Sequence, residues 1–563
     1  MKRNRLLCFS ALVLFVLIGI NGFSQTDKKL NAAFAEDIGF LSSDMLEGRL
    51  AGSYFEGMAA AYISNRYIEA GLLPMGDNNT YLQAFDFSVG KRLLNSTSFD
   101  IGARSLALMD DYYPLPSSAE ADINNIPLVF AGFGIQAPDL NYNDYADIMP
   151  VDGRAVVIKM SYKGGYSPDS EFEMFSGLNS KIDLAIEKGA KAVLIANFDK
   201  NTEDPGHDYS RNVTEKGVPV IFITQEVYDD LLGLPKPEIS LHIAFQKINR
   251  TGHNVLGYID NKAANTIIIG GHFDHLGWGD YGSLYTGSKM IHNGADDNAS
   301  GSSMVIQLAK YLAGGKYTNH NYLIIAFTGE ELGLYGSKYF TDHPTIDLSS
   351  VSCMLNFDMV GRFNDEKGTL EIGGTGTSPI WNKMLDNNIP KNFKIKRSES
   401  GMGPSDHMSF YLKDLPVLFF FTGTHEDYHK PSDDIDKINY AGMDMVYRYV
   451  TKTVFRMLDT QGKIEFTKTK DKDNNNSPKF SVTLGVVPDY MFDGKGMRID
   501  GVRDGKPADI AGILAGDVVI KMGPVNVEDM MSYMEALSKF HKGDTIMVTV
   551  LRGEETLDIE VTF

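Results

Sequence analysis

Short apolar runs recur along the chain, and most are rich in β-branched or aromatic residues. Such continuous runs are typical of strands that are buried on both faces of a sheet. Four of them, at 266–269, 322–327, 354–357 and 416–421, are separated by segments with helical character. This alternation predicts an α/β fold with a mostly parallel mixed sheet flanked by helices. Such sheets bind their ligands at the carboxyl ends of the strands.

A second group of apolar runs lies earlier, at 127–130, 155–158, 192–195 and 219–222. No grouped histidines and carboxylates accompany these runs. We therefore interpret this region as an inserted mixed α/β domain that shapes access to a site elsewhere in the chain. Before it, the spacing of apolar positions predicts an amphipathic helix over 54–70 that ends at Gly71.

The chain is long enough for several domains. Its 563 residues exceed what one hydrophobic core usually supports, which predicts about three or four domains. Residues 468–478 are polar, charged and free of apolar side chains, as is typical of a linker. The predicted organisation is a signal peptide at 1–24, the amino-terminal part of the main domain at 25–110, the inserted domain at 111–250, the rest of the main domain at 251–460, a linker at 461–479 and a small β-rich domain at 480–563.

The first residues predict export. Three basic residues precede an apolar stretch at 6–20, and small residues at 22–24 offer a cleavage site. The stretch is shorter than the ~20 residues that a membrane-spanning helix needs, so we expect a periplasmic or extracellular protein without a stable membrane anchor. Removal of this segment leaves Cys353 as the only cysteine, which excludes an internal disulfide. A net charge of -20 disfavours nucleic acid as a partner.

Potential metal ligands follow the apolar runs of the main domain. Imidazole and carboxylate ligands without thiolate suit zinc, although cobalt or manganese could occupy the same sites. Five such side chains after successive strands predict a two-metal hydrolytic site. They are His272, Asp296, Glu331, Asp358 and His429.

Two of these ligands have neighbours with a predicted role. His272 and Asp274 lie two apart at a strand end, so both point to one face, and Asp274 can orient the imidazole by accepting its second N–H. Asp296 precedes a predicted helix at 302–312 and is the candidate bridging ligand, because its two oxygens can hold two cations. Taken alone, the His-x-Asp pair could be structural, and Asp296 could cap the helix.

Glu330 and Glu331 are adjacent, so their side chains point in different directions and can take different roles. We assign Glu331 to metal and Glu330 to the general base, which must reach a water and accept its proton. An isolated Glu-Glu pair is usually a surface feature, but here it follows a strand and a glycine turn. Alternatives to His429 as a ligand are His425, His407 and Asp406.

Six segments resemble, in order, the motifs of metallopeptidase family twenty-eight, which includes bacterial leucyl aminopeptidase and glutamate carboxypeptidase relatives. They are GGHFDHLG, NGADDNASG, FTGEELGLYGS, NFDMVGR, SDH and YHKPSDD. The segments FLSSDMLEGRLAGS and EAGLLPMGDNNTYLQAF extend the resemblance over most of the chain before the linker.

This resemblance implies a zinc-peptidase fold, two Zn²⁺ ions per chain and a cis peptide between Asp296 and Asp297. The ligand set that it implies agrees with the assignments above. It places one zinc on His272 and Asp358 and the other on Glu331 and His429, with Asp296 bridging and Glu330 as base.

Two further parts of the chain resemble known domains. The insertion is similar to a protease-associated domain. Residues 483–486 resemble the carboxylate-binding loop of a PDZ domain, and 511–519 resemble a turn and strand of the same domain. A PDZ domain can add a peptide strand to its sheet edge, so its peptide-binding residues would be Leu484, Gly485 and Val486. Alternatively, the domain packs against the main domain and binds nothing.

The leading hypothesis is an exported aminopeptidase that acts on peptides or proteins through two zinc ions. A carboxypeptidase or dipeptidase is the alternative, because metal ligands do not show which substrate terminus is held, and Arg362 or Arg397 could bind a substrate carboxylate. Glutaminyl cyclisation ranks third. From another class, the chain could be an inactive peptide-binding scaffold, which metal stoichiometry would distinguish. The oligomeric state does not follow from the sequence.

Overall fold

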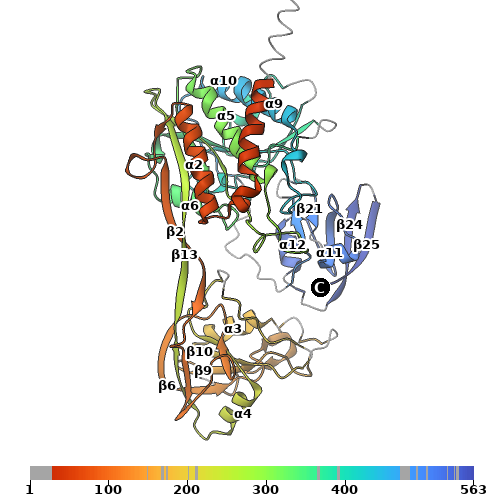
Figure 1. Cartoon of the computed structure of the whole chain (residues 1–563). Coiled ribbons are helices and arrows are strands. Elements are labelled where there is room, and N and C mark those ends of the chain that lie inside the picture. The colour runs from red at the N-terminus through yellow and green to blue at the C-terminus, as the bar shows by residue number, and fades with distance from the viewer. Residues whose placement is uncertain are drawn as a thin grey trace, which may run out of the picture.

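Three domains are visible in the computed structural model (Figure 1). It describes residues 28–563 except 149, 166–169, 173–174, 176, 201, 210–212, 364–367, 390–392, 470–481, 490–491, 493, 503–504, 529, 538, 541–543 and 554. The predicted signal peptide and most of the predicted linker lie outside the described residues. Among the described residues, no helix combines the length and apolar character needed to cross a bilayer.

The main domain is built on a mixed sheet with the strand order β1-β13-β15-β14-β16-β19-β17-β18, and β2 pairs with β13. The central strands β15, β14, β16 and β19 are parallel and contain the four predicted runs. The α/β fold class is confirmed. The strands are β1 (Leu73–Pro74), β2 (Leu82–Leu93), β13 (Phe245–Ile259), β14 (Thr266–His272), β15 (Asn321–Phe327), β16 (Val351–Phe357), β17 (Thr369–Gly373), β18 (Lys394–Arg397) and β19 (Val417–Phe421).

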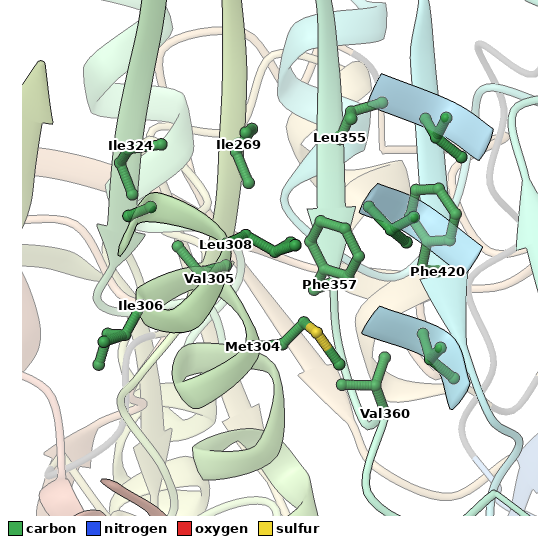
Figure 2. Close-up of a cluster of buried hydrophobic side chains, with 14 of the residues drawn as sticks. Ile269, Met304, Val305, Ile306, Leu308, Ile324, Leu355, Phe357, Val360 and Phe420 are labelled. Carbon is green, nitrogen blue, oxygen red and sulfur yellow. The ribbon is translucent and has the colours of Figure 1, made fainter. Parts of the chain in front are cut away.

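Helices cover both faces of this sheet. They are a helical segment at 28–41, α2 (Tyr54–Glu69), α5 (Gly301–Ala313), α6 (Tyr335–Asp342), α7 (Trp381–Leu385), α8 (His407–Tyr411), α9 (Tyr440–Tyr449) and α10 (Phe455–Leu458). On one face, Met304 and Leu308 of α5 pack against side chains of the central strands, including Phe357 and Phe420 (Figure 2). On the other face, α6 and α8 contribute Phe340 and Phe410 to a second core.

The ends of α2 follow from its sequence. The Ser53 side chain caps the helix by accepting from the Glu56 amide at 3.1 Å, and Gly71 follows the last turn with a φ of +79°. The predicted helix at 302–312 corresponds to α5, which is one residue longer at each end.

The second domain is an excursion between β2 and β13, which form a long antiparallel ribbon (Figure 1). Its sheet has the order β4-β3-β12-β6-β9-β10-β11-β5 and is packed on both faces. Its first strands precede residue 111, so the predicted boundary is too late. The elements are β3 (Ser98–Ile101), β4 (Arg104–Ser105), β5 (Tyr112–Pro114), β6 (Ala121–Phe130), β7 (Gln136–Ala137), β8 (Tyr142–Asn143), β9 (Ala155–Lys159), α3 (Leu178–Glu187), β10 (Ala192–Ala196), β11 (Val220–Ile223), α4 (Gln225–Gly233) and β12 (Glu238–Ile243).

The third domain follows the predicted linker and has its own hydrophobic core. Its strands have the order β20-β21-β22-β24-β25, and β23 pairs with β22. One longer helix, α12, packs on these strands through Tyr533, Ala536 and Leu537. The elements are β20 (Val486–Pro488), β21 (Met497–Val502), α11 (Pro507–Ala511), β22 (Val518–Met522), β23 (Val525–Asn526), α12 (Met530–Leu537), β24 (Thr545–Arg552) and β25 (Glu555–Thr562).

A fully buried arginine ties the amino-terminal segment to the main sheet. The guanidinium of Arg49 donates to the Phe273 carbonyl at 2.7 Å, to Asn293 at 2.6 Å and to Gly294 at 3.0 Å, and it also contacts the Leu41 carbonyl. Burial lowers the pKa of Arg49 to about 10, while nearby carboxylates oppose this effect. Arg49 therefore joins the end of β14 to the loop before α5.

We expect Arg49→Met to destabilise the main domain by about 3 kcal/mol or more, because several buried carbonyls lose their donor. Urea unfolding followed by tryptophan fluorescence measures this domain alone, since Trp278 and Trp381 are the only tryptophans of the chain. Arg92→Met is the matched control at an exposed arginine of β2 and should change stability by less than about 0.5 kcal/mol. Equal midpoints for both variants would contradict the role of Arg49.

Candidate metal centre

The candidate ligands lie at the carboxyl ends of neighbouring parallel strands. His272 is the last residue of β14, Asp358 directly follows β16, and the Glu330–Glu331 pair follows β15. His429 lies in the loop after β19. Because β15, β14, β16 and β19 are adjacent, the structure brings these side chains to one edge of the sheet.

Two groups of ligand atoms share one carboxylate, that of Asp297. On one side, His272 Nε2 lies 3.4 Å from Asp297 Oδ1 and 3.4 Å from Asp358 Oδ1. On the other side, His429 Nε2 lies 3.1 Å from Asp297 Oδ2 and 3.2 Å from Glu331 Oε2. Asp297 therefore stands between the two histidines with one oxygen toward each.

These spacings fit a pair of zinc ions. Two ligand atoms on a tetrahedral zinc, each ~2.0–2.1 Å from the metal, are about 3.3 Å apart. The four distances between ligand atoms given above, 3.1 to 3.4 Å, are close to this separation. In the part of the chain that the structure describes, Asp358 Oδ1 is buried without a hydrogen-bond partner. The donor set contains imidazole and carboxylate groups only, which is also suitable for zinc.

Asp296, the predicted bridging ligand, does not lie between the two groups. Its Oδ1 accepts from the Gly361 amide at 2.7 Å and from Ser300 Oγ at 2.8 Å, and its Oδ2 lies 3.1 Å from His425 Nε2. The bridging assignment to Asp296 is therefore wrong by one residue, because its oxygens hold the surrounding loop instead. The cis peptide is displaced in the same way and joins Asp297 to Asn298.

A second carboxylate fixes the backbone that carries Asp297. Asp433 Oδ2 accepts from the amides of Asp296 and Asp297, both at 3.0 Å. The Asp433 carbonyl also accepts from the Ala295 amide at 3.1 Å. Burial raises the pKa of Asp433 to about 6. Asp433 thus holds the loop in the orientation that points Asp297 into the site.

Hydrogen bonds on the far side of both imidazoles orient them. His272 Nδ1 donates to the Asp274 carbonyl at 3.2 Å, and the Asp274 carboxylate lies 3.7 Å away. His429 Nδ1 donates to the Gly282 carbonyl at 3.0 Å. Since a carbonyl only accepts, each Nδ1 carries the proton and each Nε2 keeps its lone pair for a metal.

The structure thus places Asp274 next to His272, although the closer acceptor is its main-chain carbonyl. Its carboxylate accepts from the Glu330 amide at 3.2 Å and so contacts the turn that carries both glutamates. Asp358 is positioned in a similar way. Ser405 Oγ donates to Asp358 Oδ2 at 2.7 Å and accepts from Asn356 Nδ2 at 2.8 Å.

The carboxylates of the site differ in their tendency to bind a proton. Burial and the neighbouring carboxylates hold the pKa of Glu330 well above its usual value, although His272 opposes this effect. Burial also raises the pKa of Asp297 and Glu331, but the neighbouring imidazoles together lower it by more. They hold the pKa of Asp297 well below its usual value and lower that of Glu331 to about 2.

One histidine at the site was missed in the sequence. His275 is fully buried, and its Nδ1 lies 2.6 Å from Glu331 Oε1 and 3.9 Å from Asp297 Oδ2. The shorter distance is that of a charge-assisted hydrogen bond rather than of two ligands on one metal. His275 is therefore placed to orient Glu331. The signal in the sequence was the second histidine of GGHFDHLG.

The alternatives to His429 lie elsewhere. His425 faces Asp296, and the ring of His407 stacks on Phe419 with centroids 4.5 Å apart. Burial lowers the pKa of His407 to about 3 and raises that of Asp406 to about 7.

A pocket opens onto the ligand groups. Besides the ligands and Glu330, it is lined by Met359, Pro404, Phe419, Phe421, Thr424, Tyr428, Pro488 and Asp489. The last two belong to the third domain. Arg362 and Arg397, which were considered for binding a substrate carboxylate, are paired with Asp427 and Asp386 at 2.6 Å each.

The two adjacent aspartates provide a matched test of the bridging assignment. We expect Asp297→Asn to weaken metal binding by more than about 100-fold, because both groups lose a charged ligand, and Asp296→Asn to weaken it by no more than about 10-fold. Metal content after dialysis against a graded chelator series measures both. Loss of metal from Asp296→Asn with retention in Asp297→Asn would reverse the assignment.

Comparison with known proteins identifies two of the domains. Residues 254–454 match the family model of peptidase family M28, and residues 464–563 match that of the PDZ domain. Among curated proteins, aminopeptidase YwaD of Bacillus subtilis is 26% identical over 296 residues, which are 50% of this chain and 61% of that protein. The probable lipoprotein aminopeptidase LpqL of Mycobacterium tuberculosis is 25% identical and is covered to 62% of its length, against 54% of this chain.

The chain thus spans less than two thirds of the length of these curated relatives. Among solved structures, a zinc aminopeptidase from Bacillus subtilis is 22% identical, with a TM-score of 0.42 over 79% of this chain and 96% of that chain. The domain matches coincide with the metal centre and with the third domain of the fold. Residues 254–454 of the main domain therefore match peptidase family M28, and the third domain of the fold is a PDZ domain.

Proposed function

We propose that this protein is an exported aminopeptidase that uses two zinc ions to remove amino-terminal residues from peptides. The observation that carries the proposal is the position of Asp297 between two groups of ligand atoms with the spacing of metal ligands. One zinc would be held by His272, Asp358 and Asp297, and the other by Glu331, His429 and Asp297. When bound, zinc supplies a Lewis acid that polarises the peptide carbonyl and activates water.

Glu330 is the candidate general base. Its Oε2 lies 3.9 Å from His272 Nε2, and its side chain lines the pocket beside the ligands. It is close enough to the reacting groups to accept a proton at Oε2 from the attacking water and to return it to the nitrogen of the leaving amine. The Glu330 amide is held by Asp274, so the turn presents Glu330 and Glu331 to different partners.

Two observations favour an aminopeptidase over a carboxypeptidase. The relatives of this chain carry the name aminopeptidase. The arginines that were considered for a substrate carboxylate are each paired with an aspartate of the protein. A scaffold without activity is the less favoured reading, because burying this many carboxylates has no structural benefit unless cations neutralise them.

We further propose that the inserted domain restricts access to the site, as the sequence suggested. Asp208 and Thr214 of this domain line one hollow together with Leu332 and Tyr335, which lie just beyond Glu330 and Glu331 in the chain. A long peptide would have to pass this hollow or the PDZ side of the pocket. The identity of the insertion as a protease-associated domain stays a prediction.

Replacement of Glu330 by Gln tests its role as the base. The amide keeps the size of the side chain but accepts no proton, so we expect kcat to fall by about 100-fold or more while zinc content stays unchanged. Glu426→Gln, at an exposed glutamate near the site, is the control and should keep wild-type kcat. Substantial turnover by Glu330→Gln would exclude Glu330 as the base.

A panel of peptides with free and acetylated amino termini tests the activity itself. We expect chelator to abolish cleavage, added zinc to restore it, and cleavage to be confined to peptides with a free amino terminus. Mass spectrometry of the products identifies the bond that is cut. Release of carboxyl-terminal residues from acetylated peptides would instead establish a carboxypeptidase, and two bound zinc ions without any cleavage would favour the scaffold.

A further inference from the structure

The PDZ domain forms part of the wall of the catalytic pocket. Pro488, the last residue of β20, and Asp489 line the same pocket as His272, Glu330 and Asp358. Any peptide chain that leaves the metal centre on this side therefore meets the PDZ domain directly.

An ion cluster around the buried carboxylate of Asp489 holds this part of the PDZ domain in place. Asp489 Oδ2 lies 3.3 Å from Lys396 Nζ of β18 and 3.2 Å from an Arg498 nitrogen of β21, and its side chain is only 3% exposed. Lys396 also pairs with Glu371 of β17 at 3.2 Å. Since a buried charge without its partner is costly, this cluster fixes the PDZ domain against the main sheet.

The strand next to the pocket is an edge strand. Among the described strands, β20 pairs only with β21, which places it at the edge of the sheet. The loop 484–486 leads into it. Gly485 has a φ of +78°, and a Cβ there would lie 2.2 Å from the Cβ of Lys506, so this loop requires glycine. A PDZ domain uses such an edge for an added peptide and such a loop for its terminal carboxylate.

The direction of β20 decides how a peptide would lie on it. The loop 484–486 is at the start of the strand and the pocket is at its end. A peptide whose carboxylate is held by the loop must run antiparallel to β20, with its amino terminus directed toward Pro488 and the metal centre. This is the direction that an aminopeptidase needs, whereas a carboxypeptidase would need the opposite one.

We propose that β20 and the loop 484–486 bind the carboxyl-terminal half of short peptide substrates whose amino-terminal residue lies at the metal centre. This inference rests on the proposed aminopeptidase function. From Leu484 to Asp489 the chain covers about 16 Å at ~3.3 Å per residue. The enzyme therefore prefers peptides of roughly six to eight residues with a free carboxyl terminus, since shorter ones do not reach the loop.

The test compares peptides of two to twelve residues that share their amino-terminal residue, each as the free acid and as the carboxyl-terminal amide. We expect amidation to lower kcat/KM by about tenfold or more at the preferred length, mainly through KM, and to have no effect on tripeptides. Equal values for acid and amide at every length would overturn the inference. Hydrolysis of a single-residue anilide, which cannot reach β20, reports the proposed aminopeptidase function separately.

A pair of lysine variants tests whether the preference for a free carboxyl terminus depends on the docking of the PDZ domain against the main domain. Lys396→Ala removes the main-domain partner of Asp489 and leaves its pair with Arg498 inside the PDZ domain, so the acid-to-amide ratio at the preferred length should fall toward one. Lys413→Ala breaks a comparable pair with Asp342 that does not involve the PDZ domain, and its ratio should stay at the wild-type value. An unchanged ratio in Lys396→Ala, with anilide hydrolysis intact in all proteins, would overturn the role of docking.

Discussion

The concentration of buried carboxylates at one sheet edge is the constraint on which the rest of this structure depends. Asp297 and Asp358 are buried, Glu330 and Glu331 are partly buried, and each belongs to one of two groups of possible ligands whose atoms lie within 4.8 Å of one another. An isolated buried charge costs several kcal/mol, so such a group is stable only with compensating charge and hydrogen bonds. The surrounding carboxylates hold the pKa of His272 and His429 well above its usual value, so protonated imidazoles supply part of this compensation without metal, and two divalent cations would take the place of those protons. Because mutual repulsion favours any opening of the site, the surrounding framework has to be rigid.

The rigidity comes from groups that hold the loops by their backbone. Asp433 accepts from two successive amides beside Asp297, and Arg49 donates to carbonyls on either side of the same loop. Asp296 holds a further segment in place, because its carboxylate accepts a hydrogen bond from the Gly361 amide. These three charged side chains are not candidate ligands by geometry, yet each is buried beside the ligands. A charged residue near a metal centre can therefore form hydrogen bonds with the backbone instead of binding the metal, and the sequence alone does not distinguish the two roles.

The sequence predicted the sheet, and it predicted which strand ends carry the candidate ligands, because both depend on local pattern. The apolar runs that became β14, β15, β16 and β19 are buried on both faces, and polar side chains at their carboxyl ends stand out. The choice between Asp296 and Asp297 depends on long-range contacts instead. Adjacent residues in a loop have no fixed direction, and Asp297 adopts non-helical angles (φ −100°, ψ 97°) at the start of a helix. The boundary of the insertion was missed because β3 and β4 are short strands without an apolar run.

The candidate metal ligands at the end of the sheet determine which kind of reaction the site can perform, but they do not determine which substrate it binds. In this fold the ligands come from the central strands, whereas Phe419 and Phe421 of β19 and Pro488 and Asp489 of the PDZ domain form the walls beyond them. The ion cluster of Lys396, Asp489 and Arg498 determines where the last two lie. Selectivity therefore depends on how the domains are docked as well as on the metal centre. Since β20 points toward the pocket, its direction adds a constraint on substrate orientation that the ligand geometry does not contain.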